Sequence, residues 1–168
     1  MEEFLFEIFL SEIRRQCEFS FIALRQIELG LQNNNVEIVW YNLQNFLISV
    51  ANISKILWPN QNYKRRGEKL RQRLKISEDS LIKSRKFRNH FEHFDERLDE
   101  WFKATENYNY VDSNIGDIKT INGIDVKDIL RNFNPKNFEL IFRGEKYELQ
   151  PVIKEINEIY FKVKFEIK

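Results

Sequence analysis

The two histidines of the chain, His90 and His93, follow a strongly basic run of residues. An imidazole exchanges a proton near neutral pH, so it suits general acid–base chemistry. The run from 64 to 75 contains seven basic residues and one acid, and further basic residues continue it to Arg88. Because phosphate contacts provide most sequence-independent binding of nucleic acid, cations beside an acid–base residue indicate a phosphodiester substrate. The alternative interpretation is a solvated helix face.

Helical periodicity separates the side chains of this segment by direction. At about 100° per residue, one arc holds the apolar residues and predicts a core stripe of Phe87, Phe91, Phe94, Leu98, Trp101 and Phe102. Asn89 and His93 lie four residues apart and point away from the stripe, so we expect His93 to be exposed. Arg88 lies some 140° from His93 around the axis. One helix therefore presents both only if the arginine curls round, or a second copy completes the site.

The residues Arg88-Asn89-His90-Phe91-Glu92-His93 carry a family resemblance. They resemble the motif of the HEPN superfamily, which is an Arg, a short spacer beginning with Asn, Asp or His, and then a His. The resemblance extends to the helical layout of residues 3–102, with the motif on a late helix. It does not cover residues 103–150.

The resemblance implies a helical bundle that forms a homodimer and brings two copies of the motif to one cleft. Many HEPN proteins are metal-independent endoribonucleases of toxin–antitoxin, phage-defence or RNA-processing systems, and others bind without cutting. In such a site His93 would move the proton of the 2′-hydroxyl, Arg88 would stabilise charge on the phosphorus, and Asn89 would orient the histidine ring or a phosphate oxygen. RNA, a second copy, and an antitoxin or nucleotidyltransferase are the expected partners, without a metal or cofactor. The candidate RNA-binding residues are Lys64, Arg65, Arg66, Arg71 and Arg85.

Other chemistries remain as alternatives. His90 is a second candidate for the acid–base or a supporting role, although it lies nearer the core stripe. His90 and His93, with Glu92 or Glu96, could also bind a metal. A non-catalytic dimeric module that binds RNA, a nucleotide or a protein would have almost the same sequence, and so would a purely structural helical protein. Cys17 lacks a catalytic partner by sequence, and no glycine-rich phosphate loop is present.

The elements that would position these residues are mainly helical. Apolar residues at three- and four-residue intervals predict long helices over 3–31 and 36–58, joined by an Asn-rich turn and therefore antiparallel. A short helix is expected over 63–74, and a fourth from the Ser77-Glu78-Asp79 capping group to about Phe102. We therefore expect an antiparallel bundle of four to five helices.

Residues 103–150 should form an insertion before the last helix. The stretch 107–123 is polar and lacks a helical period, which predicts an irregular arm. The segment 138–149, with Arg143-Gly144 at its centre, predicts a β-hairpin. Pro151 can begin a C-terminal helix over 151–168, although alternation at 163–167 also permits a strand. Residues 1–168 are expected to form a single domain.

Composition limits the classes of protein that remain. The 168 residues include five Gly and three Pro, too few for a turn-rich sandwich or barrel. A net charge of +1 predicts no global attraction to nucleic acid or membrane, so any attraction must be local. The single cysteine excludes an internal disulfide framework. With no apolar run near the roughly 20 residues of a membrane span, and an acidic start unlike a signal peptide, we expect a cytoplasmic protein.

Overall fold

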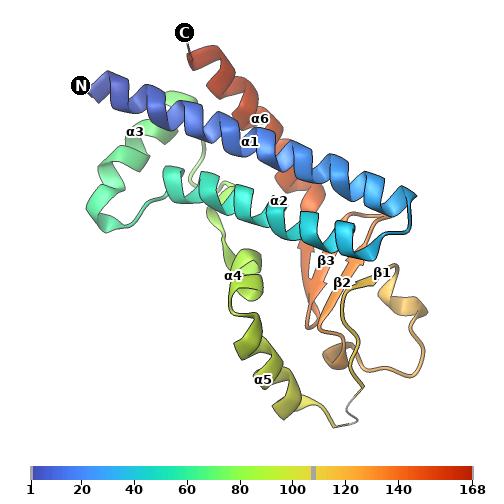
Figure 1. The fold of residues 1–168 in the computed structure, drawn as a ribbon. Coiled ribbons are helices and arrows are strands. Elements are labelled where there is room, and N and C mark those ends of the chain that lie inside the picture. The colour runs from blue at the N-terminus through green and yellow to red at the C-terminus, as the bar shows by residue number, and fades with distance from the viewer. Residues whose placement is uncertain (1, 107–108, 168) are drawn as a thin grey trace. The chain divides into compact units, whose positions relative to one another are not determined.

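The computed structural model describes residues 2–106 and 109–167 of a mainly helical chain (Figure 1). A small four-stranded sheet precedes the C-terminal helix. The chain divides into two compact units, of which unit 1 comprises residues 1–85 and 152–168 and unit 2 comprises residues 86–151. Unit 2 thus combines the segment 86–102, expected among the core helices, with the sheet.

Unit 1 contains the long helices that periodicity predicted. Helix α1 spans Glu2–Gln32 and α2 spans Val36–Leu57, and the two run antiparallel side by side (Figure 1). The turn between them places Asn34 at a φ of 51°, and the side chain of Asn35 caps α2 by accepting a hydrogen bond from the Ile38 N–H. The 3-10 turn η1 spans Gln61–Tyr63 and leads into α3, Lys64–Leu74, as expected.

The C-terminal helix α6 spans Leu149–Glu166. Its buried residues recur at three- and four-residue intervals, at Val152, Ile156, Ile159 and Val163. This spacing is helical, so the strand alternative at 163–167 was wrong. Arg73 on α3 fixes this end of unit 1, because its guanidinium pairs with Glu166 on α6 and Glu3 on α1 at 2.8 and 2.7 Å.

A buried arginine joins α3 to the end of α2. The Arg71 side chain is 8% exposed, pairs with Glu78 at 2.6 Å and donates a hydrogen bond to the Leu57 carbonyl. This approach requires Gly67, because a Cβ there would lie 2.4 Å from Pro59 Cδ and 2.6 Å from the Leu57 oxygen. The α2–α3 junction therefore has no room for a side chain at Gly67.

We expect Gly67→Ala to destabilise the protein. In an open helix the same change would add about 1 kcal/mol of stability, but here backbone must move, which costs about 1–3 kcal/mol. Urea denaturation should show a lower free energy of unfolding, with Gly30→Ala as the comparison because its closest contact is a Val39 methyl group at 2.9 Å. Unchanged or increased stability of Gly67→Ala would contradict the packing described.

Unit 2 begins with two short helices instead of one long one. Residues Leu81–Lys83 form the 3-10 turn η2 within unit 1, α4 spans Lys86–Glu92, and α5 spans Phe94–Ala104. The expectation of a single helix from the 77–79 capping group to about Phe102 was therefore wrong. The helix is interrupted at His93, whose φ and ψ are −103° and 41°.

The sheet of unit 2 has the strand order β1-β2-β3-β4. Strands β3, Glu139–Phe142, and β4, Glu145–Glu148, form the expected hairpin. Arg143 and Gly144 form its turn with φ of 47° and 80°, as a two-residue turn of type I′ requires. Strand β2, Arg131–Asn134, pairs antiparallel with β3, and β1, Asn114–Ile115, pairs parallel with β2.

The sequence did not predict β1, which has only two residues, or β2, which lacks the tight hairpin turn that indicated β3 and β4. The 3-10 turns η3, Ile118–Thr120, and η4, Val126–Asp128, connect them. Of the expected irregular arm 107–123, residues 107–108 lie outside the described part of the structure.

Candidate functional site

The motif segment, residues 88–93, is held against the sheet within unit 2. The His90 ring stacks on Phe142 of β3 with centroids 4.7 Å apart, and Phe91 contacts the same ring edge-on at 6.0 Å. Arg131 of β2 lies over the rings of Phe94 and Phe91 at 4.3 and 5.7 Å. Side chains on both sides of the helix break are thereby fixed to strands β2 and β3.

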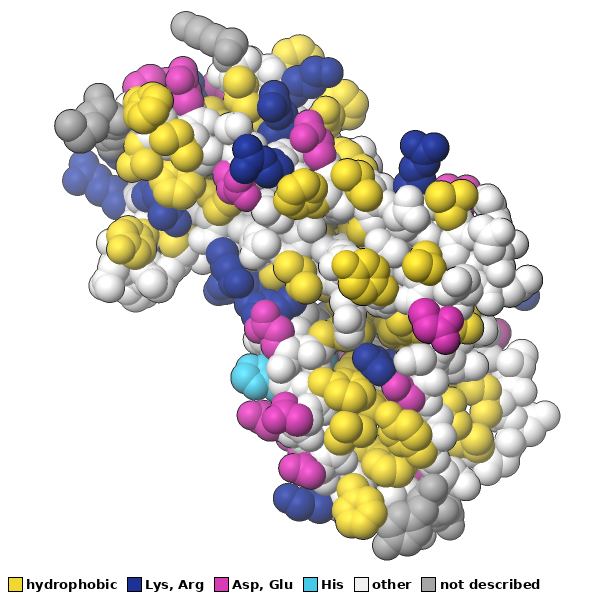
Figure 2. All heavy atoms as spheres, viewed as in Figure 1, with side chains coloured by type: hydrophobic (Ala, Val, Ile, Leu, Met, Phe, Trp, Pro, Cys, Tyr) yellow, Lys and Arg dark blue, Asp and Glu magenta, His cyan; other side chains and the backbone are white. Residues whose placement is uncertain are grey.

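The helix break leaves His93 at the surface. Its side chain is 53% exposed, and Nδ1 lies 3.4 Å from a carboxylate oxygen of Glu96. The His93 N–H still donates to the Asn89 carbonyl at 3.0 Å, so exposed Asn89 lies one turn before it. Figure 2 shows a histidine at the surface over α4 and α5, with acidic side chains around it. The sequence prediction of an exposed His93 is confirmed.

Arg88 is more enclosed than His93. Its side chain is 13% exposed and forms an ion pair with Glu92, which lies one turn later in the motif segment. Any anion that binds Arg88 in this arrangement must compete with a carboxylate of the same chain. The arginine is therefore positioned by the motif itself.

His90 lies in a packed and mostly buried environment. Its side chain is 14% exposed, and Nε2 lies 3.2 Å from Glu145, which also pairs with Lys86. Burial lowers the pKa of His90, and the Glu145 carboxylate opposes that shift only in part. A ring that is stacked, mostly buried and biased toward its neutral form supports packing more than proton transfer. The two histidines also contact different carboxylates.

This environment predicts a pH dependence of stability. Because the folded-state pKa of His90 is below 6.5, the unfolded chain binds more protons around that pH, and stability falls as the pH falls through it. When the pH is lowered from about 7 to about 5.5, the midpoint temperature of thermal unfolding of the wild type should fall. His90→Gln should reduce this fall. His93→Gln is the matched control and should keep it. An identical fall in wild type and His90→Gln would contradict the assignment.

The predicted core stripe is confirmed only in part. Trp101 is buried and donates to the Asp128 carbonyl at 3.3 Å, while Phe91, Phe94 and Leu98 are half-buried. Phe102 is 60% exposed, so its placement in the core was wrong: it lies about 100° around α5 from buried Trp101, at the edge of the packed face. The side chain of Phe87 lies outside the described part of the structure.

The candidate RNA-binding residues divide into structural and surface cations. Arg71 is buried at the α2–α3 junction, so we leave it out of the proposed RNA contacts. Lys64 pairs with Glu68 at 3.8 Å. Arg65 is exposed and Arg85 half-buried. Arg66 is half-buried against aromatic rings of unit 1, and in the described ranges neither Arg65 nor Arg66 forms an ion pair.

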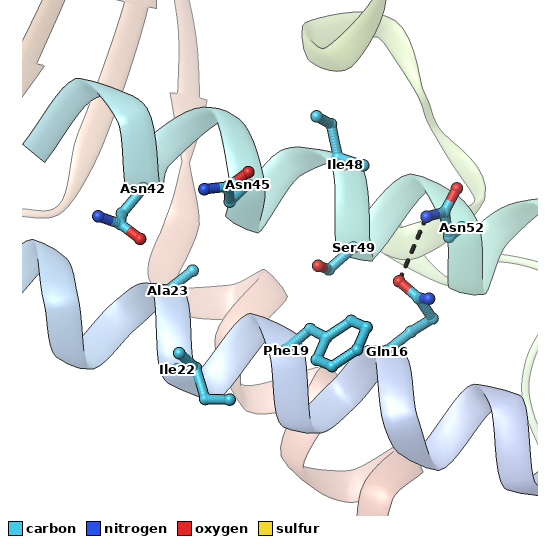
Figure 3. A pocket seen from close by; sticks show the side chains of 9 residues that line it. All are labelled: Gln16, Phe19, Ile22, Ala23, Asn42, Asn45, Ile48, Ser49 and Asn52. Atoms are coloured by element: carbon cyan, nitrogen blue, oxygen red, sulfur yellow. Dashed lines mark hydrogen bonds between the residues drawn. The ribbon is translucent and has the colours of Figure 1, made fainter. Parts of the chain in front are cut away.

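An amide-lined groove between α1 and α2 was not found from the sequence. It has a volume of about 380 Å³, and Gln16, Asn42, Asn45 and Asn52 lie along it with apolar neighbours such as Ile48 (Figure 3). Asn52 donates to Gln16 across the groove at 3.2 Å. None of its lining residues carries a formal charge, so it lacks the cation that a phosphodiester would need. Periodicity could have indicated these amides only as breaks in the apolar faces.

The described residues offer neither a reactive thiol nor a cluster of metal ligands. Cys17 is fully buried, and burial raises its pKa to about 12, which disfavours the reactive thiolate. Among residues 2–106 and 109–167, no three His, Cys, Asp or Glu side chains gather as a metal-binding group. None of the helices in these ranges combines the length and apolar character needed to cross a bilayer.

Comparisons with protein-family models, with curated proteins and with solved structures each found no match for this chain. The chain's own residues are therefore the basis for its proposed function.

Proposed function

We propose that the protein is a metal-independent endoribonuclease of the HEPN type that acts as a homodimer. The observation that carries this proposal is the surface position of His93 at a helix break, one turn after exposed Asn89 and on the same segment as Arg88. The residue types match the HEPN motif, and an exposed imidazole is accessible to a substrate as large as RNA. The antiparallel helical bundle and the cytoplasmic location expected from the sequence belong to the same proposal.

The reaction needs only the groups of the motif and of RNA itself. His93 accepts the proton of the 2′-hydroxyl as its oxygen forms a bond to phosphorus. Arg88 stabilises the negative charge on the pentavalent phosphorus by charge-assisted hydrogen bonds. The bond from phosphorus to the 5′-oxygen then breaks, and the leaving oxygen takes a proton from a second imidazole or water. The products are a 2′,3′-cyclic phosphate and a 5′-hydroxyl.

The enclosure of Arg88 favours a site that combines two copies. Arg88 points along α4 toward Glu92, whereas His93 follows the break and contacts Glu96 on α5. Two neighbouring motif segments related by a two-fold axis could supply an arginine and a histidine to one phosphate from different chains. Partners such as an antitoxin or a nucleotidyltransferase fit the same class of protein.

The catalytic roles predict large losses of activity. His93→Ala should lower the rate of RNA cleavage by about 10²–10⁴-fold, and Arg88→Ala by a similar factor, because each removes a group that acts in the transition state. Asp95→Asn, at an exposed neighbour on α5, is the control and should cut normally. Cleavage should survive EDTA and leave cyclic phosphate ends. Normal cutting by His93→Ala, or complete loss in EDTA, would show that the mechanism is wrong.

A mixing experiment tests the composite site. Light scattering should first give about twice the 20.5 kDa mass of one chain. Purified Arg88→Ala and His93→Ala proteins, each inactive alone, should regain part of the wild-type rate when subunits are exchanged, because a mixed dimer holds one intact pair. No recovery in verified mixed dimers would place both residues of each site in one chain.

The second candidate is a non-catalytic module that binds RNA, a nucleotide or a protein. The ion pair of Arg88 with Glu92 favours it, because it neutralises the cation that catalysis would use. Tight RNA binding by wild-type protein with no cleavage would support this candidate over the enzyme.

A further inference from the structure

A second pocket lies in unit 1, between the first turns of α1 and the start of α3. It has a volume of about 470 Å³, within the range of small-ligand sites. Its apolar wall comes from Leu5, Phe6 and Phe9 of α1 and Tyr63 of η1. Tyr63 is 56% exposed and Leu5 47% exposed, so both present apolar surface to a ligand. We call this site the basic pocket because its remaining lining residues are cations.

The cations of the basic pocket are Arg65, Arg66 and Lys69. Arg65 and Lys69 are one helical turn apart on α3, so they lie on the same face of the helix. Two carboxylates close to these cations in the sequence or the fold, Glu3 and Glu68, pair with Arg73 and Lys64. In the part of the chain that the structure describes, Arg65 and Arg66 have no ion-pair partner. The pocket therefore has positive charge that an anion would balance.

Arg66 is held between two aromatic rings. Its guanidinium carbon lies 4.3 Å from the centroid of Phe9 and 5.4 Å from that of Tyr63. Its Nε is buried without a hydrogen-bond partner among the described residues, and desolvation by burial lowers the pKa of the group. A poorly solvated cation fixed against aromatic faces gains more from an anion than a solvated lysine does.

Figure 2 shows the corresponding surface, where apolar side chains gather beside Lys and Arg side chains toward the N-terminal end of α1. An aromatic wall next to fixed cations suits a ligand with a flat ring and a phosphate. Base stacking on aromatic side chains and cations along the backbone are the two elements of single-strand recognition. A base-paired duplex keeps its bases stacked inside and cannot offer one to Tyr63.

We propose that the basic pocket binds one unstacked nucleotide, with the base against Tyr63 and the phosphate at Arg65 and Arg66. The nucleotide chemistry is common to a single-stranded RNA and to a free nucleotide. As a contact for RNA, the inference rests on the proposed function and gives that protein a preference for single strands. It names a site in unit 1, separate in residues from the motif segment of unit 2.

The test measures binding apart from cleavage. All variants are made in full-length His93→Ala protein, and fluorescence anisotropy follows a labelled oligouridine. Tyr63→Ala should weaken binding roughly five- to 150-fold, and Tyr63→Phe should restore it. Tyr41→Ala, at a tyrosine of α2 that is 64% exposed, is the matched control and should bind like the parent. Equal binding by Tyr63→Ala and Tyr41→Ala would overturn the proposal.

The same protein tests the role of the pocket's positive charge and distinguishes RNA from a free nucleotide as the ligand. Arg65→Gln should weaken binding and should reduce the slope of log affinity against log salt concentration by the amount expected for about one phosphate contact. Lys154→Gln on α6 should change neither the affinity nor the slope. If uridine monophosphate displaces the oligouridine from the parent but not from Tyr63→Ala, a free nucleotide is sufficient for binding at the pocket. If only oligonucleotides displace the probe, the ligand is single-stranded RNA. Polyphosphate that competes as well as the oligouridine at equal phosphate would overturn the nucleotide assignment.

Failure of this proposal and failure of the proposed function give different results. If proteins with an intact motif that carry Tyr63→Ala or Arg65→Gln cut RNA normally, and the same substitutions leave binding of the oligouridine unchanged, the motif function stands and the pocket assignment is wrong. If the wild type cuts no RNA but Tyr63→Ala loses binding, the pocket assignment stands and the enzyme assignment is wrong.

Discussion

The guanidinium of Arg131 is the interaction on which unit 2 depends. It forms two hydrogen bonds to Asp112 at 2.7 and 2.5 Å and lies over the rings of Phe94 and Phe91. One side chain thus connects strand β2, the segment before β1, and both helices that flank the break. Because the Arg131 and Asp112 side chains are 13% and 14% exposed, removal of one partner would leave the other largely buried and unpaired.

Helix α4 needs these contacts because it has only seven residues. An isolated helix of that length does not form in water, since too few hydrogen bonds offset the cost of nucleation. Its stability must come from packing, which His90 and Phe91 supply against Phe142. The two histidines of the motif segment therefore have separate tasks, with His90 holding the helix to the sheet and His93 remaining available to solvent.

The sequence predicted elements whose signals are local and missed those that depend on distant residues. Helices α1, α2 and α6 were found from apolar periodicity, and the hairpin from the segment around its Arg143-Gly144 turn. A short helix was also expected where α3 lies. The break at His93 has no such signal, because Phe94 and Trp101 continue the period across it. The break follows from contacts to strands β2 and β3, which lie about 40–50 residues further along the chain. The exposure of His93 was predictable, but the enclosure of Arg88 and the basic pocket were not.

The number of basic residues in a segment likewise does not show how many of them a ligand can contact. The run 64–75 has seven basic residues, yet Arg71 and Arg73 are used to join helices of unit 1, with carboxylates at 2.6 to 2.8 Å. A salt bridge of that kind satisfies the cation and withdraws it from solvent, so net charge overestimates what a ligand can meet. Arg66 differs because the folded chain brings the rings of Phe9 and Tyr63 to it, and Arg65 differs because it is exposed without an ion-pair partner among the described residues. The cations that best suit an anionic ligand are thus those that the fold itself does not neutralise.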